Sequence, residues 1–424
     1  MYIKRIYLKN IRCFKKLNLQ LTCPADSCRW IIIFGENGVG KTTILRSIAM
    51  GLSDETSTYG MLSELSGDII RDGCSDALIE IELVTEKSKE PVVISTKISR
   101  ESMGKPTIQK EPKDFEWHRI FACGYGAARR AFGSESYEEY KLIDSVYTLF
   151  RYDASLQNPE IPFSRLEREK VDVEDLFRRI ERILNLPEHS IKLDRSGFSV
   201  KGPWGTYQPL GAIADGYSAT FAWIADLLGW AALFQKTKFQ PDFPGIVLLD
   251  EVEHHLHPSW QRNIIFNLCK QFPKIQFVGS THAPMCAVGS TDLEDDECDL
   301  VILRCVEDHV EGSAGHKPPR GKRADQILTS YLFGLSTSGD RETREQIEKY
   351  SALLGKRDRD ATEDKQLQDL RSVLDQKLGS AESEFEQRVR EAVSKVLMSK
   401  PGSQGEKPQA VDYEIMRQLK ELLE

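Results

Sequence analysis

A glycine-rich loop between a predicted strand and a predicted helix constrains this chain more than any other feature. The apolar run 30–34 predicts a buried strand, residues 35–42 have the form GxxxxGK[ST], and residues 44–49 have helical spacing. Glycines allow backbone N–H groups to curl around phosphate oxygens, and the helix directs its positive end at the anion. The sequence therefore predicts a triphosphate site, with ATP as the nucleotide and Mg²⁺ as the metal.

The residues of this loop have separate expected roles. Lys41 reaches the β- and γ-phosphates, and the hydroxyl of Thr42 ligates Mg²⁺. A chance glycine turn is the alternative, but the strand, the Lys-Thr pair and the helix together argue against it. The residues predicted to bind nucleotide in this segment are Asn37, Gly38, Gly40, Lys41, Thr42 and Thr43.

Two later strands are predicted to end in catalytic side chains. Four apolar residues, 246–249, precede Asp250 and Glu251, so Asp250 is expected near the Mg²⁺ held by Thr42 and Glu251 can polarise the attacking water. The run 275–280 predicts another strand, and His282 after it can donate a hydrogen bond to the γ-phosphate. An acidic strand end and a structural histidine are the plainer alternatives. We predict Lys41, Glu251 and His282 as catalytic, and Thr42 and Asp250 as metal ligands.

A third candidate segment is Asp215-Gly216-Tyr217, which precedes a strongly apolar helix. Glycine at a helix N-terminus can offer backbone N–H groups to an anion, here the γ-phosphate of a nucleotide bound to a second copy of the chain. The alternative is that Asp215 is a simple N-cap.

The order of elements predicts an α/β fold with parallel strands and flanking antiparallel strands. Strands alternate with helices in the second half, whereas runs 77–84 and 91–100 predict an antiparallel hairpin beside the nucleotide site. We expect an ATPase lobe over 1–133, a helical insertion over 134–200, a second ATPase lobe over 201–335 and a helical region over 336–424. In that last region Leu367, Leu370, Leu374 and Leu378 begin an apolar spacing typical of amphipathic helices, either a solvated tail or a docking element.

Composition narrows the classes of function. A net charge of −8 argues against a surface that coats nucleic acid, although local basic patches such as residues 316–323 can touch phosphates. The longest apolar stretch, 219–234, is shorter than a membrane span and contains Asp226, so no membrane partner is expected. Nine cysteines without a CxxC pair argue against a zinc ribbon or a disulfide framework and fit a reducing cytoplasm.

In this order, the motifs resemble those of ABC-type ATPases of the SMC/RecF/OLD class. Residues 1–14 resemble the opening strand of that class with its Asn-x-Arg-x-Phe, and residues 250–258 resemble the D-E-x-E-x-H-L-H-P form of OLD-like and defence ATPases. Segments 121–129, 324–328 and 331–335 resemble the ATPase subunits of Septu antiphage defence systems.

The resemblance implies a head-to-tail homodimer, or a higher homo-oligomer, around ATP. It also implies that Arg12 contacts the phosphates, and that a small HNH endonuclease (PtuB-like) docks on the ATPase, since the sequence has no His-Asn-His arrangement of its own. Two departures favour slow turnover. Ala214 stands where the family signature has serine, and the glutamine of the family's Q-loop is missing near 121–130, a region that Tyr125 or Arg129 occupies instead.

Several alternatives remain open from the sequence. One is a RecF- or SMC-like DNA repair ATPase without a nuclease, and another is a scaffold that nucleotide only locks. DNA, or a retron reverse transcriptase with its single-stranded DNA, are further partners that the resemblance allows. A metal cluster of His254, His255 and His257 competes with a nucleotide-interface role for that loop.

Overall fold

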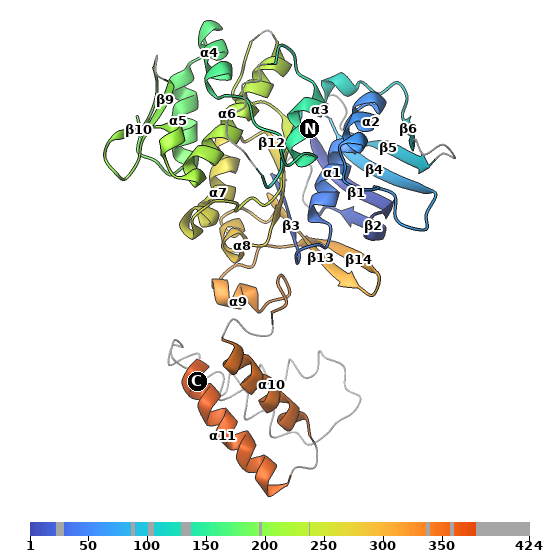
Figure 1. Ribbon diagram of the computed structural model, residues 1–424, viewed down its shortest axis with the longest axis vertical. Helices are drawn as coiled ribbons and strands as arrows, with labels where there is room; N and C mark the ends of the chain where they lie inside the picture. Colours follow the sequence, from blue (N-terminus) through green and yellow to red (C-terminus); the bar gives the residue numbers. More distant parts are fainter. Residues whose placement is uncertain are drawn as a thin grey trace. The chain divides into compact units, whose positions relative to one another are not determined.

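The chain forms two compact units, residues 1–335 and 336–424 (Figure 1). The computed structural model describes residues 1–22, 29–85, 90–100, 106–128, 137–194, 197–236, 238–335, 340–356 and 360–378. Arg129 and the segment from 379 to the C-terminus, with its predicted helices, lie outside the described residues.

A six-stranded sheet forms the centre of the first unit. Its order is β14-β13-β3-β12-β11-β7, and all neighbours are parallel except β13 and β14. The strands are β3 (Trp30–Phe34), β7 (Ala122–Tyr125), β11 (Gly245–Leu249), β12 (Ile275–Thr281), β13 (Cys298–Val306) and β14 (His309–His316). The parallel core predicted from the alternating elements is confirmed, whereas β13 and β14 were not anticipated.

Apolar residues on both faces explain why this sheet is covered on both sides. In β3, Ile31 and Ile33 pack into one core together with helix α1 (Lys41–Gly51), which follows the loop. Trp30, Ile32 and Phe34 alternate with them and pack into a second core under helix α6 (Asp215–Gln235). Strands with both faces buried are typical of parallel sheets.

A five-stranded antiparallel sheet, β2-β1-β4-β5-β6, contributes to the same core as α1. The pairing of β4 with β5 confirms the hairpin predicted over 77–84 and 91–100. The strands are β1 (Tyr2–Ile11), β2 (Phe14–Gln20), β4 (Asp76–Val84), β5 (Val92–Arg100) and β6 (Pro106–Glu111), and helix α2 (Glu55–Ser63) follows α1. In Figure 1 this blue sheet lies beside α1.

The segment predicted as a helical insertion is only partly helical. It contains the helices α3 (Leu142–Ser145), α4 (Glu160–Arg168) and α5 (Val173–Ile183). They are followed by the strands β8 (Ile191–Asp194) and β9 (Gly197–Lys201), and β9 pairs with both β8 and β10 (Tyr207–Pro209). The short alternations Ile191-Lys192-Leu193 and Phe198-Ser199-Val200 have the strand period, which explains the hairpin.

Helix α6 is the core helix of the lobe formed by these elements. It is long and apolar enough to cross a membrane by length and composition, but 89% of its most apolar window is buried inside the protein. The helix is longer than the apolar stretch 219–234, so its length does not exclude a membrane span. Its burial inside the protein identifies it as a core element.

The remaining elements complete the two units. In the first unit they are α7 (Pro258–Gln271), α8 (Pro284–Ser290) and α9 (Ala324–Leu328). The second unit contains α10 (Arg341–Gly355) and α11 (Ala361–Leu378), which are joined by an ion pair between Glu342 and Lys377 at 2.9 Å. Asp340 caps α10 by accepting a hydrogen bond from the backbone N–H of Thr343.

A buried lysine holds the C-terminal end of α1. The Nζ of Lys110 in β6 donates to the carbonyl of Met50 at 2.6 Å and to the hydroxyl of Thr96 at 3.0 Å. A cation there complements the negative end of the helix whose opposite end faces the predicted phosphates. Burial lowers the pKa of Lys110 to about 7, although the carboxylates of Asp54 and Glu55 oppose the shift.

We predict that replacement of this lysine changes how stability depends on pH. Because the pKa of Lys110 is about 7 in the folded state and 10.5 ordinarily, the unfolded chain binds more protons between those values, and stability rises with pH there. The free energy of unfolding of the wild type should therefore increase relative to Lys110→Met by a few kcal/mol, at about 1.4 kcal/mol per pKa unit.

Chemical denaturation from about pH 7 to pH 10 measures this difference. Lys97→Met, at an exposed position of the neighbouring strand β5, is the matched control. Its free energy of unfolding should change with pH in the same way as that of the wild type. Parallel stability curves for the wild type and Lys110→Met would contradict the assignment.

Candidate nucleotide-binding site

The register of three parallel strands brings the predicted site residues to one edge of the sheet. Phe34 of β3 pairs with Thr281 of β12, and Leu249 of β11 pairs with Gly279 of β12. The glycine-rich loop, Asp250 and His282 begin where these strands end. Ligands of open α/β sheets bind at this carboxyl edge.

The glycine-rich loop has the backbone that its sequence predicts. Gly38 and Gly40 have φ angles of 84° and 91°, in the left-handed region that favours glycine. A Cβ on Gly40 would lie 2.6 Å from Cys13 Sγ and 2.9 Å from the ring of Phe14, so only glycine fits there. Asn37 and Gly38 are exposed at the rim of the loop.

Lys41 and Thr43 lie beneath this rim. The Nζ of Lys41 donates to the carbonyls of Gly35, at 2.7 Å, and Glu36, at 2.9 Å. Burial lowers the pKa of Lys41, and the carboxylates of Glu253, Asp250 and Glu251 oppose that shift. Thr43 is buried in the first turn of α1, and its carbonyl accepts a hydrogen bond from Ser47.

Thr42 and Asp250 are in direct contact. The hydroxyl of Thr42 donates to Asp250 Oδ2 at 2.6 Å, and the hydroxyl of Ser280 donates to Asp250 Oδ1 at 2.5 Å. A hydroxyl and a carboxylate at the end of a phosphate loop form the oxygen donor set that Mg²⁺ prefers. The donor set therefore fits the predicted metal. Ser280 was not predicted, although its place in the Gly279-Ser280-Thr281 strand end was the available signal.

Glu251 follows Asp250 in a constrained turn. Its φ angle is 49°, unusual for a residue with a side chain, and its backbone N–H donates to the hydroxyl of Ser280 at 2.9 Å. The carboxylate is about one-third exposed and lies 3.6 Å from Nδ1 of His254. Glu251 thus presents a partly solvated carboxylate at the same edge as Asp250.

His282 is held by a carboxylate that sequence reasoning did not assign. Glu253 Oε1 accepts one hydrogen bond, from the backbone N–H of His282 at 2.8 Å. The same oxygen lies 2.9 Å from Nδ1 of the His282 ring. The sequence feature that could have identified Glu253 is its place as the second glutamate of the Asp-Glu-x-Glu pattern. The pairing itself depends on tertiary contact between the turns after β11 and β12.

The N-terminus of α6 is not capped by Asp215, which was the alternative role considered for that residue. Ala214 is the N-cap residue, no side chain caps the helix, and Asp215 is the first helical residue. The N-cap alternative for Asp215 is therefore wrong, because the helix begins one residue earlier than that interpretation requires. Ala214 and Asp215 are exposed, and Tyr217 packs edge-on against Trp260 and Trp204.

Gly216 lies against the loop that follows Glu251 in the same chain. A Cβ on Gly216 would be 2.4 Å from the carbonyl oxygen of His255. This close approach of two backbones gives Gly216 a packing role, and the exposed helix end beside it remains open to a ligand.

The three histidines of this loop do not form a metal site. Among the described residues, no group of three or more His, Cys, Asp or Glu side chains is arranged to hold an ion. The rings of His254 and His255 pack edge-on, with centroids 3.9 Å apart. His257 instead caps α7, because its Nδ1 accepts a hydrogen bond from the backbone N–H of Ser259 at 3.3 Å.

Arg12 lies in a tight turn beside the glycine-rich loop. Its φ angle is 43°, and its guanidinium donates to the backbone carbonyls of Asp68 at 3.2 Å and Ser66 at 3.0 Å. Burial and the nearby charge of Arg46 lower the pKa of Arg12. The next residue, Cys13, has its Sγ 3.7 Å from the carbonyl oxygen of Val39, so this turn touches the loop directly.

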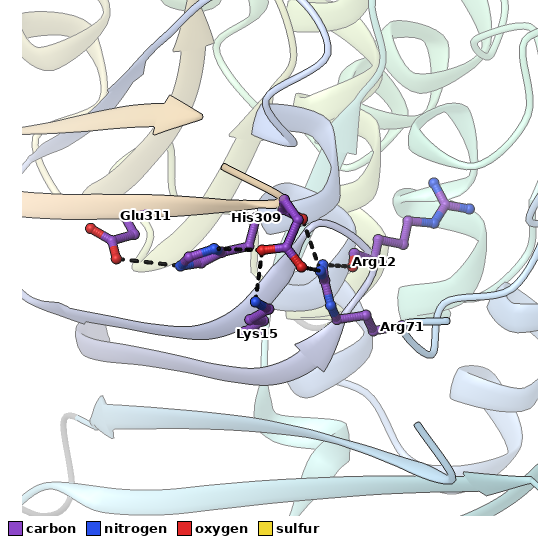
Figure 2. Close-up of polar contacts among 6 residues, drawn as sticks. Arg12, Lys15, Arg71, His309 and Glu311 are labelled. Carbon is purple, nitrogen blue, oxygen red and sulfur yellow. Dashed lines mark hydrogen bonds and ion pairs between the residues drawn. The ribbon is translucent and has the colours of Figure 1, made fainter. Parts of the chain in front are cut away.

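A cluster of ion pairs around Asp308 contacts the backbone of the Arg12 turn (Figure 2). Asp308, between β13 and β14, accepts a hydrogen bond from Lys15 at 2.7 Å and pairs with Arg71 at 3.3 Å. Arg71 also donates to the carbonyl of Arg12 at 3.0 Å. The hydrogen bond from Lys15, followed by the contact with His309, lowers the pKa of Asp308 to about 2. Figure 2 shows the Arg12 side chain leading away from this cluster.

Tyr125 does not replace the missing glutamine at the nucleotide. Its hydroxyl donates to Asp226 Oδ2 in α6 at 3.0 Å, and both residues are buried. Burial raises the pKa of Asp226 to about 6, although hydrogen bonds from Gln157 and Tyr125 oppose the shift. The backbone of Tyr125 nevertheless reaches the site, since its carbonyl accepts the N–H of Asp250 at 2.8 Å.

The basic segment 316–323 is tied to the protein surface. Arg320 donates to the carbonyls of Thr291 and Leu293 and pairs with Asp295 at 2.9 Å. Lys317 donates to the carbonyl of Asp295. Part of its positive charge is therefore already engaged, which weakens the interpretation of this segment as a nucleic-acid contact.

This arrangement of glycine-rich loop, acidic strand end and uncapped helix is that of a P-loop ATPase. A family model described as "AAA domain" matches residues 5–194. A second, described as "AAA domain, putative AbiEii toxin, Type IV TA system", matches residues 126–285.

The chain is also similar to individual proteins and to a solved structure. The chain is 27% identical over 380 residues to the Septu protein PtuA of Bacillus mycoides (strain KBAB4), covering 87% of this chain and 50% of that protein. It is 45% identical over 73 residues to the retron Ec83 probable ATPase of Escherichia coli, covering 17% of this chain and 14% of that protein. The SMC head domain from Thermotoga maritima aligns with a TM-score of 0.43 at 17% identity, covering 74% of this chain and 98% of that one. The chain spans about half the length of the Septu protein.

We predict that Gly216→Ala lowers stability even without nucleotide. The added methyl meets a backbone oxygen, which cannot rotate away, so a cost of about 1–3 kcal/mol is expected from overpacking. Gly211→Ala is the matched control, because a Cβ there meets nothing within 4 Å. Denaturant unfolding of the two variants measures the difference. Equal stability of Gly216→Ala and the control would contradict the close packing against His255.

Proposed function

We propose that two copies of this chain enclose ATP head-to-tail, hydrolyse it, and control a nuclease in antiviral defence. The observation that carries the hydrolytic part is the contact of Thr42 with Asp250 at the edge where Glu251 and His282 also emerge. Phosphoryl transfer depends mainly on positioning and on electrostatic stabilisation, and these groups supply both.

Each group has a distinct part in the proposed reaction. The backbone of the loop from Gly35 to Gly40 cradles the phosphates, and Lys41 leaves its carbonyl partners to pair with them. Thr42 and Asp250 would hold Mg²⁺. When bound, the ion neutralises charge that develops on the phosphate oxygens. Glu251 orients and deprotonates the attacking water, and His282 donates to the γ-phosphate.

The exposed end of α6 supports the proposal that a second copy completes the site. No side chain caps this 21-residue helix, so its first N–H groups are available to an anion. Ala214 at the signature serine position removes one hydroxyl from that contact. The remaining backbone donors would close the site on the partner's nucleotide, with weaker contact and slow turnover.

The likeness to the Septu protein and to retron ATPases supports a role in defence. An HNH endonuclease subunit is the partner that a Septu arrangement would supply, and the helices of residues 340–378 are its proposed docking element. A retron arrangement, with reverse transcriptase and single-stranded DNA, is the second candidate, favoured by the 45% identity over 73 residues. Co-purification with each partner, expressed from the neighbouring genes, separates the two.

We predict that Glu251→Gln retains ATP and loses hydrolysis. The amide preserves the size of the side chain but cannot accept the proton of water, so kcat should fall about 10²- to 10⁴-fold. Binding of a fluorescent ATP analogue should change little, and the ATP-bound dimer should accumulate in light scattering. Glu169→Gln, at an exposed position after α4, is the matched control. Hydrolysis at the wild-type rate would refute the assignment of the base.

We also predict that Asp308→Ala weakens ATP binding through Arg12. Loss of the anchor for Lys15 and Arg71 loosens the Arg12 turn, and the affinity should fall about 3- to 10-fold, less at high salt. Glu311→Gln is the control, since Glu311 contacts only His309 in this cluster. The combined Arg12→Ala and Asp308→Ala variant should bind no more weakly than Arg12→Ala alone. Additive losses would show that Asp308 does not act through Arg12.

A further inference from the structure

Glu253 and His282 form a carboxylate–imidazole pair at the edge of the nucleotide site. Glu253 lies three residues after Asp250, and His282 is the first residue after β12. The carboxylate is buried, with a side-chain exposure of 7%, whereas the imidazole is about half exposed at 49%. The ring is therefore anchored on the protein side and open on the other.

A single oxygen of Glu253 makes both contacts with His282. Oε1 accepts the backbone N–H at 2.8 Å and lies 2.9 Å from ring Nδ1. A carboxylate oxygen at that distance favours the tautomer with its hydrogen on Nδ1 and orients the ring. Nε2 is then left on the open side of the ring, and it makes no hydrogen bond with the described part of the chain.

We propose that Glu253 is the positioning residue that directs Nε2 of His282 at the γ-phosphate. This inference rests on the ATPase function proposed above. A ring that carries a hydrogen on both nitrogens can donate from Nδ1 to Glu253 and from Nε2 to a phosphate oxygen. Glu253 thus acts through His282 and not on water.

The environment of the second oxygen of Glu253 supports a functional role for the charge of this side chain. Oε2 is buried and has no hydrogen-bond partner among the described residues. A buried carboxylate oxygen without a partner costs free energy, and an anchor for the His282 backbone alone would need only one neutral acceptor. Among the three carboxylates that oppose the fall in the pKa of Lys41, Glu253 has the largest effect. Its charge therefore reaches the phosphate side of the site.

The other role open to Glu253 is that of the general base in place of Glu251. The contacts argue against it, because Oε1 accepts the backbone N–H of His282 and lies against its ring, and the carboxylate is nearly inaccessible. Glu251 is the more exposed carboxylate of the two. A double-mutant cycle separates the two roles, since a base and a positioning residue combine differently with loss of His282.

The first test is the tautomer of His282 in the nucleotide-free protein. Two-bond ¹H–¹⁵N spectra of the histidine side chains, with His282 assigned by its loss in His282→Ala, should show a proton on Nδ1. In Glu253→Ala the signal should move to the averaged position of an exposed imidazole. A wild-type ring with its proton on Nε2 alone would overturn the inference, whether or not the protein hydrolyses ATP.

The second test is kinetic. Glu253→Ala should lower kcat about 10- to 100-fold, and Glu253→Gln, which keeps the acceptor but loses the charge, should lower it less. The affinity for a fluorescent ATP analogue should change by no more than about 3-fold in either variant, which separates positioning from binding. Combining Glu253→Ala with His282→Ala should cost no more than His282→Ala alone. A multiplicative loss would overturn the inference.

Two controls keep these results interpretable. Glu169→Gln should match the wild type, and thermal unfolding of every variant excludes loss of fold as the cause. Absence of ATP hydrolysis by the wild type would refute the proposed function. The tautomer of His282 would still decide whether Glu253 orients the ring.

Discussion

The site depends first on the contact between the Thr42 hydroxyl and the Asp250 carboxylate. These residues are 208 positions apart, and their oxygens meet at 2.6 Å because β3 and β11 flank β12 in parallel register. Ser280 holds the other oxygen of Asp250, so the carboxylate is fixed from helix α1 and from the neighbouring strand β12. The proposed metal ligands, the proposed water-activating residue and the proposed γ-phosphate donor thereby share one edge of the sheet, as preorganised catalysis requires.

The charges at this edge also define what can bind there. Three carboxylates, Asp250, Glu251 and Glu253, influence a single buried cation, Lys41. Such an edge repels a bare triphosphate, and the positive contributions must come from the helix end of α1, from Lys41 and from a divalent cation. The Arg12 turn adds a further cation close to the loop, and Arg46 beside it helps to lower its pKa. Nucleotide and metal are therefore expected to bind as one unit.

The parts of the structure that could be predicted from sequence are those that depend on local pattern. The glycine-rich loop, the acidic strand end and the β4–β5 hairpin follow from short-range periodicity and backbone requirements. The Ser280 contact, the Glu253–His282 pair and the Asp308 anchor of Arg12 depend on strand register and on turns brought together by the fold. The N-cap alternative for Asp215 was wrong because N-cap preference identifies aspartate as a cap, whereas the helix here uses Ala214 and leaves its end without a side-chain cap. The hairpin of β8 and β9 was missed because its alternations are too short to outweigh the helical pattern before them.

Helix α6 connects the catalytic edge to the surface that a second copy would meet. Near its start, the backbone at Gly216 lies against the carbonyl of His255, in the turn that follows Glu251. Near its middle, Asp226 accepts a hydrogen bond from Tyr125, whose carbonyl accepts the N–H of Asp250. The helix is thus joined twice to the segment that carries the catalytic carboxylates, once through packing and once through a buried hydrogen-bonded carboxylate. A shift of Asp250 or Glu251 on hydrolysis cannot occur without strain at one of these two contacts. Because the exposed helix end is the element proposed to hold the second nucleotide, that strain acts where the dimer would open.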